Sequence, residues 1–329
     1  MKAAYYVSSP TSTVSSRVLC LLCPLILSLV SAASSESRQG QHSLSTQGII
    51  NGVEVEHPSE KYPFFALPTT APDSDEWLGC GASLISPTYA LSAAHCFGGG
   101  DTPCAGPKKI KLWFGDLQLD GMRMIVPLPG GKSHQVEAEL IGCHPGWDGK
   151  CSHGHDMVLL KLTSGTPLPS WMRPVHLNLD GLAADGADDT ATIIGFGLME
   201  VPGSRDLVGD ISTVLRETTV TIFKEDHKPC VDVFATGLGC SDDASEAPAI
   251  NLEQQVCAAH PALRDSCAGD SGAPMMDANG VQIAIVSYGG GAGGDSGPGR
   301  TCGDPNWPGI YSRVHPFASF IRETVPDLP

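Results

Sequence analysis

Residues 265–274 read Asp-Ser-Cys-Ala-Gly-Asp-Ser-Gly-Ala-Pro, and this stretch decides how the rest of the chain is interpreted. Its serine, Ser271, is flanked by Gly269 and Gly272. Because glycine adopts backbone conformations closed to other residues, the pair allows a tight turn whose N–H groups stay free. Such N–H groups can stabilise the oxyanion that forms when a serine hydroxyl attacks a carbonyl. The stretch therefore indicates a nucleophilic serine, which needs a base and a carboxylate from elsewhere in the chain.

Two other strings offer those groups. Residues 91–96 read Leu-Ser-Ala-Ala-His-Cys, and residues 155–162 read His-Asp-Met-Val-Leu-Leu-Lys-Leu. Imidazole titrates near neutral pH and can take the proton of a serine, while a carboxylate fixes its tautomer and stabilises its charged form. A single His, Asp or Ser is more often structural than catalytic. The combination of His95, Asp156 and Ser271 is what predicts nucleophilic acyl transfer.

In this order, and in these apolar and cysteine-containing contexts, the three strings resemble those of the chymotrypsin/trypsin-fold serine peptidases over about residues 49–325. The resemblance implies an all-β fold of two antiparallel six-stranded β-barrels with a C-terminal helix. The first barrel is expected from about residue 49 to 162 and the second from about 175 to 314. It also implies a secreted serine endopeptidase that cleaves through an acyl-enzyme.

Roles follow from the resemblance residue by residue. His95 is expected to act as general base and then general acid, Asp156 to orient His95, and Ser271 to be the nucleophile. The backbone N–H groups of Gly269 and Ser271 are expected to form the oxyanion hole.

The residue pattern independently favours strands. Gly 38 and Pro 26 make the chain rich in turns. Short apolar runs bounded by turn residues are expected as strands at 64–67, 81–85, 110–114, 157–160, 191–194, 220–222 and 281–286. One helix is expected at Pro316–Val325, where Pro316 stands in the first turn and apolar residues share one face.

Substrate preference is read from four residues that match the pocket of the family. Asp265 corresponds to the residue at the bottom of the primary pocket, Gly289 and Gly309 correspond to its walls, and Ser287 is expected to bind substrate beside them. A carboxylate at the end of a narrow slot pairs with Lys or Arg and is left unpaired by an apolar side chain. The resemblance therefore implies cleavage after Arg or Lys. A solvated loop acid with no such role is the alternative for Asp265, and a peptidase of another specificity is the alternative for the chain.

Activation in the family frees the amino group of an Ile or Val, which then pairs with the Asp before the nucleophile. The matching residues are Ile49 and Asp270. The residue before Ile49 is Gly48 rather than Arg or Lys, so simple self-activation is not expected. A protease of different specificity, or trimming after an earlier cut, would have to expose Ile49.

The N-terminal part of the chain predicts export. Lys2 and Arg17 are its first charges, a mostly apolar run covers residues 18–30, and small residues follow. This is the order of a signal peptide, and the run is shorter than the ~20 residues of a membrane span. We expect a signal peptide over 1–32, a pro-segment over 33–48 and the peptidase domain over 49–329, in a secreted, extracellular protein with no membrane segment in its mature form.

Composition limits the partners. With Lys+Arg 20 against Asp+Glu 36, the net charge of −16 argues against nucleic acid or an anionic membrane as partner. Protein or peptide substrates are expected, with protein inhibitors of proteases as further partners. No cofactor is expected. The ligand-like cluster at 153–156, His-Gly-His-Asp, lacks a distant partner, so no metal site is expected either.

The cysteines beyond the leader are even in number, as in disulfide-bonded exported proteins. The resemblance implies the pairs Cys80–Cys96, Cys230–Cys257 and Cys267–Cys302. Among the remaining four, the short separation favours Cys143–Cys151, which leaves Cys104 and Cys240 by subtraction.

Two other functions compete with the peptidase. A catalytically silent homologue that acts as a binding module would not react with an active-site fluorophosphonate. An esterase of another fold would need G-x-S-x-G with its catalytic His after the Ser. The sequence has no G-x-S-x-G, and the His of the His-Cys string, His95, comes before Ser271. A second G-D-S-G-P string contains Ser296, but the glycine-rich run around it offers no rigid support, so Ser271 is favoured as nucleophile.

Overall fold

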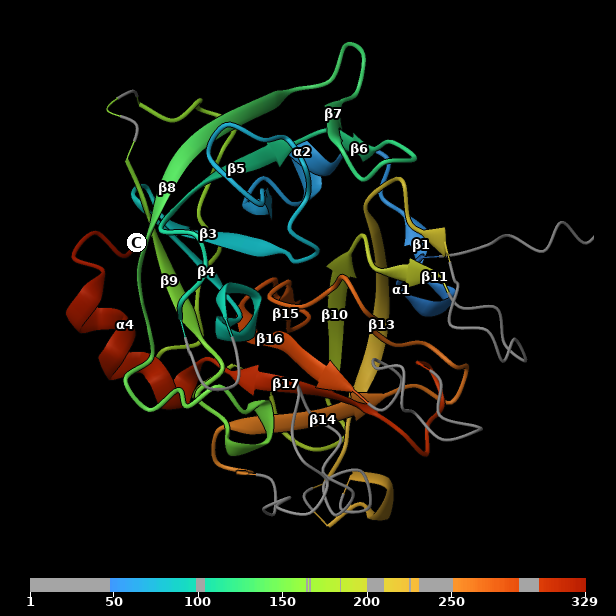
Figure 1. Cartoon of the computed structure of the whole chain (residues 1–329). Helices are drawn as coiled ribbons and strands as arrows, with labels where there is room; N and C mark the ends of the chain where they lie inside the picture. Colours follow the sequence, from blue (N-terminus) through green and yellow to red (C-terminus); the bar gives the residue numbers. More distant parts are fainter. Residues whose placement is uncertain are drawn as a thin grey trace, which may run out of the picture. The chain divides into compact units, whose positions relative to one another are not determined.

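The computed structural model describes most of the chain after the predicted leader. The described residues are 48–98, 104–163, 165, 167–183, 185–199, 210–224, 226–230, 251–289 and 302–329. Strands dominate this part of the chain (Figure 1). The predicted signal peptide, most of the pro-segment, Cys240 and Ser296 lie outside it.

Six antiparallel strands form the first barrel, which closes in the order β2-β3-β4-β9-β8-β5 (Figure 1). They are β2 (Phe65–Pro68), β3 (Ala82–Ser86), β4 (Tyr89–Ser92), β5 (Lys109–Gly115), β8 (Ser133–Cys143) and β9 (Val158–Leu162). Strand β5 alternates buried and less buried residues, as expected for a strand with one face on the core. β3, β4 and β2 are buried along their whole length.

The second barrel is also built from six strands. Its order is β13-β10-β15-β16-β17-β14, and a further pairing of β13 with β14 closes the ring. The strands are β10 (Thr190–Gly195), β13 (Arg216–Ile222), β14 (Gln255–Ala259), β15 (Pro274–Met276), β16 (Gln282–Gly289) and β17 (Gly309–Arg313). Strand β1 (Val53–Glu54) adds to the outer edge of β13. The predicted two-barrel, all-β fold is confirmed.

Short elements connect the barrels and lead to the site. They are α1 (Gly48–Asn51), α2 (Pro58–Lys61), η1 (Ala94–Phe97), β6 (Leu117–Leu119), β7 (Ile125–Pro127), η2 (Cys151–His153), β11 (Leu198–Met199) and β12 (Asp210–Ile211). The C-terminal helix is shorter than the predicted Pro316–Val325. It is a 3₁₀ turn, η3 (His315–Phe317), followed by α4 (Ala318–Thr324), with Ile321 fully buried. Pro316 falls in the 3₁₀ turn, where its missing N–H costs nothing. None of the described helices has the length and apolar character needed to cross a bilayer.

Every predicted strand overlaps an observed one, but the predicted runs did not include five of the twelve barrel strands, β4, β8, β14, β15 and β17, of which β8 and β14 show why. β8 carries Glu137 and Glu139 on an exposed face, so its apolar positions are too sparse to stand out. β14 is buried throughout but begins with a buried polar residue, Gln255. Both strands were hidden because tertiary neighbours, rather than local composition, stabilise them.

Four disulfides join described cysteines: Cys80–Cys96, Cys104–Cys143, Cys230–Cys257 and Cys267–Cys302. Three of these are the pairs that the resemblance implied. The predicted pair Cys143–Cys151 is wrong, and so is the assignment of Cys104 to Cys240. The segment after Cys104 runs beside β8, where Leu140 N–H donates to Lys108 O at 3.0 Å, and this brings Cys104 to the end of that strand. Cys151 is itself disulfide-bonded.

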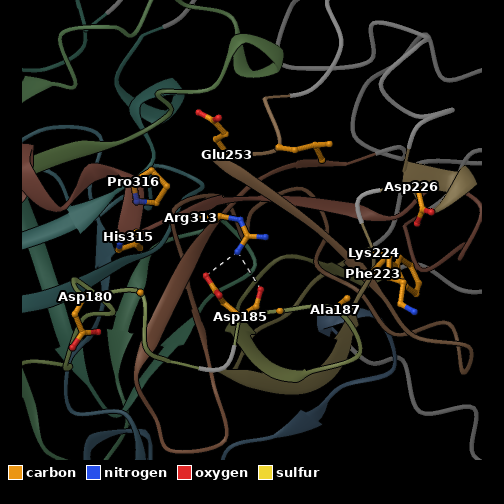
Figure 2. Close-up of a pocket in the computed structure, with 13 residues that line it drawn as sticks. Asp180, Asp185, Ala187, Phe223, Lys224, Asp226, Glu253, Arg313, His315 and Pro316 are labelled. Carbon is orange, nitrogen blue, oxygen red and sulfur yellow. Dashed lines mark hydrogen bonds and ion pairs between the residues drawn. The ribbon is translucent and has the colours of Figure 1, made fainter.

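A surface pocket on the second barrel contains none of the predicted site residues (Figure 2). Arg313 on β17 reaches into it and donates to the main-chain oxygen and the carboxylate of Asp185, at 3.1 and 2.8 Å. The other charged groups that line it are Asp180, Lys224, Asp226, Glu253 and His315. The ion pair ties the end of β17 to the loop before β10.

The revised pairing gives the first prediction. Non-reducing peptide mapping should recover Cys104 linked to Cys143. The double variant Cys104→Ser/Cys143→Ser should lose about 2–4 kcal/mol in the free energy of unfolding, because the bridge no longer restricts the unfolded chain. A linked Cys143–Cys151 peptide would contradict the structure.

Candidate active site

His95 and Asp156 meet because their strands are neighbours in the first barrel. His95 lies in η1, just after β4, and Asp156 lies just before β9; Ser92 and Val158 are partners where these strands pair. The backbone N–H of His95 donates to Asp156 Oδ1 at 2.9 Å. The ring Nδ1 lies 2.8 Å from Asp156 Oδ2. An ionised carboxylate only accepts, so this contact places the neutral ring's proton on Nδ1 and leaves Nε2 as the basic nitrogen.

The second barrel also contributes to this carboxylate. The hydroxyl of Ser287, on β16, donates a short hydrogen bond to Asp156 Oδ2. Asp156 itself is fully buried. Ser287 was predicted to bind substrate, which stays a prediction, and in the structure its side chain supports Asp156.

For both His95 and Asp156, burial shifts the pKa in one direction and the interaction between the two residues shifts it in the other. Burial lowers the pKa of His95, but the charge of Asp156 and the hydrogen bond to it outweigh burial, so the pKa is raised. Burial raises the pKa of Asp156, but the charge and hydrogen bonds of His95, together with the Ser287 hydroxyl, bring it below its ordinary value. The pair therefore favours an ionised Asp156 beside an imidazole that binds a proton readily.

Ser271 stands in a tight turn that the first barrel holds. Gly269 and Gly272 have φ angles of +101° and +77°, so both use the conformation that only glycine adopts freely. The N–H of Gly81, just before β3, donates to Ser271 O at 2.7 Å. A Cβ on Gly272 would lie 2.3 Å from the hydroxyl oxygen of Ser92. The turn is thus pressed against the strands that precede His95.

The reactive atoms of the turn have no partner among the described residues. Neither the N–H groups of Gly269 and Ser271 nor the Ser271 hydroxyl is bonded to any of them. Cys96 Sγ lies 3.9 Å from His95 Nε2 and also 3.9 Å from Ser271 O, so the histidine and the serine are close neighbours. In unliganded sites the bond between nucleophile and base is often long and shortens on substrate binding.

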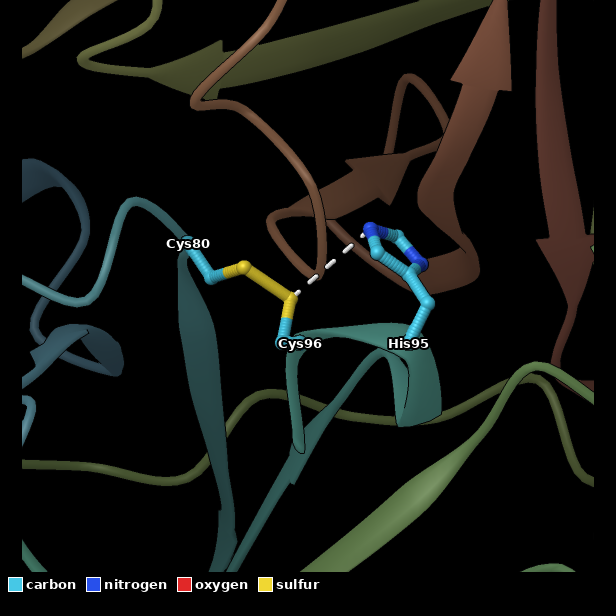
Figure 3. A group of neighbouring side chains, drawn as sticks. All are labelled: Cys80, His95 and Cys96. Carbon is cyan, nitrogen blue, oxygen red and sulfur yellow. Dashed lines mark hydrogen bonds between the residues drawn. A yellow bond between two sulfur atoms is a disulfide. The ribbon is translucent and has the colours of Figure 1, made fainter. Parts of the chain in front are cut away.

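Sulfur atoms near His95 raise the question of a metal site. Cys80, His95 and Cys96 form one cluster of ligand-type atoms (Figure 3), and His95, Cys151 and Asp156 form another. The sulfurs of Cys80 and Cys96 are bonded to each other, and Cys151 is disulfide-bonded as well. Disulfide sulfur cannot supply the thiolate that a metal ligand requires, so these clusters do not fit a metal ion.

The predicted pocket residues other than Ser287 lie together. Asp265 is 2% exposed and accepts from Ser266 N at 2.8 Å and from the Tyr311 hydroxyl at 3.1 Å. A Cβ on Gly309 would lie 2.6 Å from Asp265 Oδ1, and one on Gly289 would lie 3.5 Å from Gly309 Cα. Burial raises the pKa of Asp265 to about 7, despite these bonds. Tyr311 is a contact of this carboxylate that the sequence did not indicate.

Ile49 and Asp270, the predicted activation residues, are both buried. The chain continues through Gly48, and Ile49 is already 0% exposed. Asp270 accepts from Cys267 N at 2.9 Å and Gly197 N at 2.7 Å. No cation pairs with it among the described residues, and burial, with a contribution from the charge of Asp265, raises its pKa to about 7.

Comparison with known proteins identifies the family. The family model described as Trypsin matches residues 49–321. The chain therefore belongs to the trypsin family, and the matched region begins at the residue expected to open the domain.

Named relatives agree with this placement. The chain is 28% identical to a tryptase of Mus musculus over 94% of its own length and 98% of the relative. It is 27% identical to the CLIP domain-containing serine protease B9 of Anopheles gambiae, over 75% of the chain and 56% of that relative, so it spans little more than half of that protein. A solved structure of neuropsin, a serine protease of mouse brain, has a TM-score of 0.60 at 24% identity. It covers 84% of this chain and 99% of its own, and at this identity it supports the fold alone.

The His95–Asp156 pair gives the second prediction. An NMR titration should place the pKa of His95 above 6.5, and Asp156→Asn should lower it, because burial then acts without an opposing charge. Ser287→Ala is the matched control, since it removes a hydrogen bond to Asp156 but no charge, and it should lower the His95 pKa far less.

The free energy of unfolding should depend on pH, and His95 and Asp156 should lose their contributions at opposite ends of the pH range. Because the folded pKa of His95 is raised, its contribution is present below about 6.5 and is lost as pH rises through the folded value. Because that of Asp156 is lowered, its contribution is present above about 3.8 and is lost as pH falls through the folded value. A pKa for His95 that Asp156→Asn leaves unchanged would contradict this account.

Proposed function

We propose that this chain is a secreted serine endopeptidase that cleaves peptide bonds after Arg or Lys through an acyl-enzyme. The observation that carries the proposal is the double hydrogen bond from His95 to the buried Asp156, next to a glycine turn that presents Ser271 with unbonded N–H groups. Membership of the trypsin family and the protease names of the relatives support it.

The proposed chemistry assigns one task to each group. His95 Nε2 takes the proton of Ser271 Oγ as the oxygen forms a bond to the substrate carbonyl carbon, and the carbonyl oxygen becomes an oxyanion. The N–H groups of Gly269 and Ser271 bind that oxyanion. His95 then gives its proton to the leaving nitrogen as the C–N bond breaks. Water, activated by the same imidazole, releases the acyl group from Ser271.

Asp156 has an electrostatic and a geometric part in this proposal. Its charge stabilises the imidazolium that forms in each half of the reaction, and its contact with Nδ1 fixes the ring tautomer, while its bond from the backbone N–H of His95 holds the residue in place. The Ser287 hydroxyl supports the carboxylate from the second barrel, so we assign Ser287 to positioning Asp156.

The preference for Arg or Lys rests on Asp265. This carboxylate is buried without a cation among the described residues, and burial alone would keep it partly protonated near neutral pH. A cationic side chain of the substrate would restore the ionised form of Asp265 by pairing with it. An apolar side chain would leave Asp265 either as an unpaired buried charge or as a protonated carboxyl group. Gly289 and Gly309 add no side chain next to this carboxylate, where a Cβ on Gly309 would lie 2.6 Å from Asp265 Oδ1.

In the proposed activation step, too, a cation pairs with a buried carboxylate. A cut between Gly48 and Ile49 would turn an amide nitrogen into an α-ammonium group. Ile49 is already buried, and the N–H of Ile50 donates to Asp265 O at 2.9 Å, which holds this segment beside the 265–270 stretch. The new cation would pair with the carboxylate of Asp270, beside which the described part of the chain places no cation. Because Gly48 precedes Ile49, either a protease with a preference other than Arg or Lys would make the cut, or trimming after an earlier cut would expose Ile49.

The proposal extends to export from the cell and to partners, and the sequence is the basis for both. A signal peptide over 1–32 and a pro-segment over 33–48 would place the enzyme outside the cell. Its partners would be protein or peptide substrates and protein inhibitors of proteases.

The third prediction tests catalysis together with activation. Gly48→Arg, incubated with trypsin, should yield a chain that begins at Ile49, reacts with a fluorophosphonate and hydrolyses a reporter peptide. In this background Ser271→Ala should abolish labelling and reduce turnover ~10⁴-fold or more. Ser296→Ala is the matched control, because it changes the serine of the second G-D-S-G-P string, and it should keep both properties.

Failure of this experiment has a defined meaning. If the chain begins at Ile49 and still neither binds the fluorophosphonate nor cleaves any reporter, the chain is a silent homologue that acts by binding. Loss of labelling in Ser296→Ala instead would move the nucleophile to the other string.

The fourth prediction concerns specificity. Asp265→Asn should lower kcat/KM for Arg and Lys reporters by about 10²–10³-fold, because a buried cation loses its partner, and should change an Ala reporter little. Asp277→Asn is the matched control: Asp277 is also buried, at 3% exposed, but it bonds only its own turn, at Asn279 and Val281. A wild-type preference for Phe or Ala would contradict the role given to Asp265.

A further inference from the structure

Trp77 is a buried side chain that neither the sequence strings nor the proposed chemistry uses. It lies in the segment between β2 and β3 and is 1% exposed. Its ring nitrogen donates to Cys80 O at 2.6 Å, and its backbone N–H donates to Arg123 O at 3.0 Å. Two hydrogen bonds therefore hold Trp77 in place, one through its ring and one through its backbone. The residue lies next to Cys80, whose disulfide partner Cys96 follows His95.

The far edge of this indole touches the oxyanion turn. A Cβ on Gly269 would lie 2.9 Å from Trp77 Cη2 and 3.7 Å from Cζ2. The same Cβ would lie 3.0 Å from the Cα of Gly197. Gly269 is thus in close contact with an aromatic ring of the first barrel and with a backbone segment of the second. The N–H of Gly269 itself has no acceptor among the described residues, so no hydrogen bond sets its direction.

Two contacts hold the indole against that glycine. The ring of Phe196 packs against it, with centroids 6.5 Å apart, and Phe196 in turn stacks on Phe65 at 6.3 Å. The guanidinium of Arg123 lies over the indole, with Cζ 5.1 Å from the ring centroid. Arg123 projects from the exposed turn between β6 and β7, and it reaches the ring because Gly79 has no side chain: a Cβ there would lie 2.8 Å from the guanidinium.

We propose that Trp77 is a positioning residue for catalysis: its indole, pressed down by Arg123, sets the position of the Gly269 N–H in the oxyanion hole. This rests on the proposed peptidase function. Hydrogen-bond donors in such a hole are useful only when they already point to where the negative charge develops, because any movement during the reaction weakens the stabilisation. A glycine at φ +101° has little intrinsic preference for one position, so packing has to supply it.

Such a role predicts a particular kinetic signature. The oxyanion exists only in the transition state and the tetrahedral intermediate, so a displaced Gly269 N–H should lower kcat and leave KM nearly unchanged. A general loss of packing would instead lower stability without selecting the tetrahedral state. The two effects are separable by making the same Trp→Phe replacement at Trp77 and at a tryptophan outside the site.

Trp77→Phe is the direct test, made in the activated enzyme. It removes the part of the ring that touches Gly269 and keeps an aromatic core. We expect kcat to fall about tenfold, short of the ~10²–10³ that deletion of an oxyanion donor costs, with KM within about twofold. The affinity for a peptide aldehyde, which forms a tetrahedral adduct, should fall in parallel. The affinity for the matching peptide alcohol, which cannot form one, should not change.

Trp171→Phe is the matched control. Trp171 makes the same kind of contact elsewhere, since its Cη2 would lie 3.0 Å from a Cβ on Gly115, a glycine with φ +105° outside the site. This variant should keep kcat and aldehyde affinity at the wild-type values. Equal losses of kcat in both variants, or an unchanged kcat in Trp77→Phe, would overturn the proposal.

Arg123→Gln covers the case in which Trp77→Phe does not fold. Arg123 is exposed, so its replacement leaves the core intact. It should reduce kcat about two- to threefold and aldehyde affinity to the same extent, without affecting the alcohol, because the indole loses the group that holds it. Wild-type aldehyde affinity in Arg123→Gln would then overturn the proposal. Failure of the peptidase function is distinct, because then the wild type and Trp171→Phe would also be inactive.

Discussion

The arrangement of this molecule depends on the burial of one carboxylate. Asp156 has no contact with solvent, and a buried charge is tolerated only when hydrogen bonds and an opposite charge satisfy it. Two of its donors belong to His95 in the first barrel, and the third is Ser287 in the second. Because the donors come from both barrels, the ionised state of Asp156 and the orientation of the His95 ring are established together, and only in the folded protein.

Asp265 and Asp270, between β14 and β15 of the second barrel, show the opposite situation. Both are buried and hydrogen-bonded, but neither has a cation beside it among the described residues, and burial raises both pKa values to about 7. Asp156, with His95 beside it, has a lowered pKa. In the proposed function the missing cations arrive later: an Arg or Lys side chain of the substrate at Asp265, and the α-ammonium of Ile49 at Asp270. Specificity and activation would then depend on the same arrangement: a carboxylate that is already buried before the cation that pairs with it is present.

The turn that carries Ser271 is held by shape rather than by charge. Gly269 and Gly272 are glycines because side chains there would collide with Trp77 and Ser92, respectively. Gly81 adds one backbone hydrogen bond to the serine carbonyl. These three contacts come from the first barrel, whereas the turn leads into the second. The proposed oxyanion hole is therefore formed where the barrels pack together, and its geometry depends on residues that carry no chemistry of their own.

The sequence by itself indicated the family, the all-β fold and most of the candidate site, because these depend on local signals: a glycine turn around a serine, a His-Cys pair, and apolar runs bounded by turns. It could not indicate that Cys104 pairs with Cys143, that Ser287 bonds Asp156, or that Trp77 lies against Gly269. Each of these joins residues from different strands or barrels, and no local pattern records such a contact. Only the closure of the barrels brought these side chains within bonding distance, since register and barrel packing, rather than neighbouring residues, determine which distant segments touch.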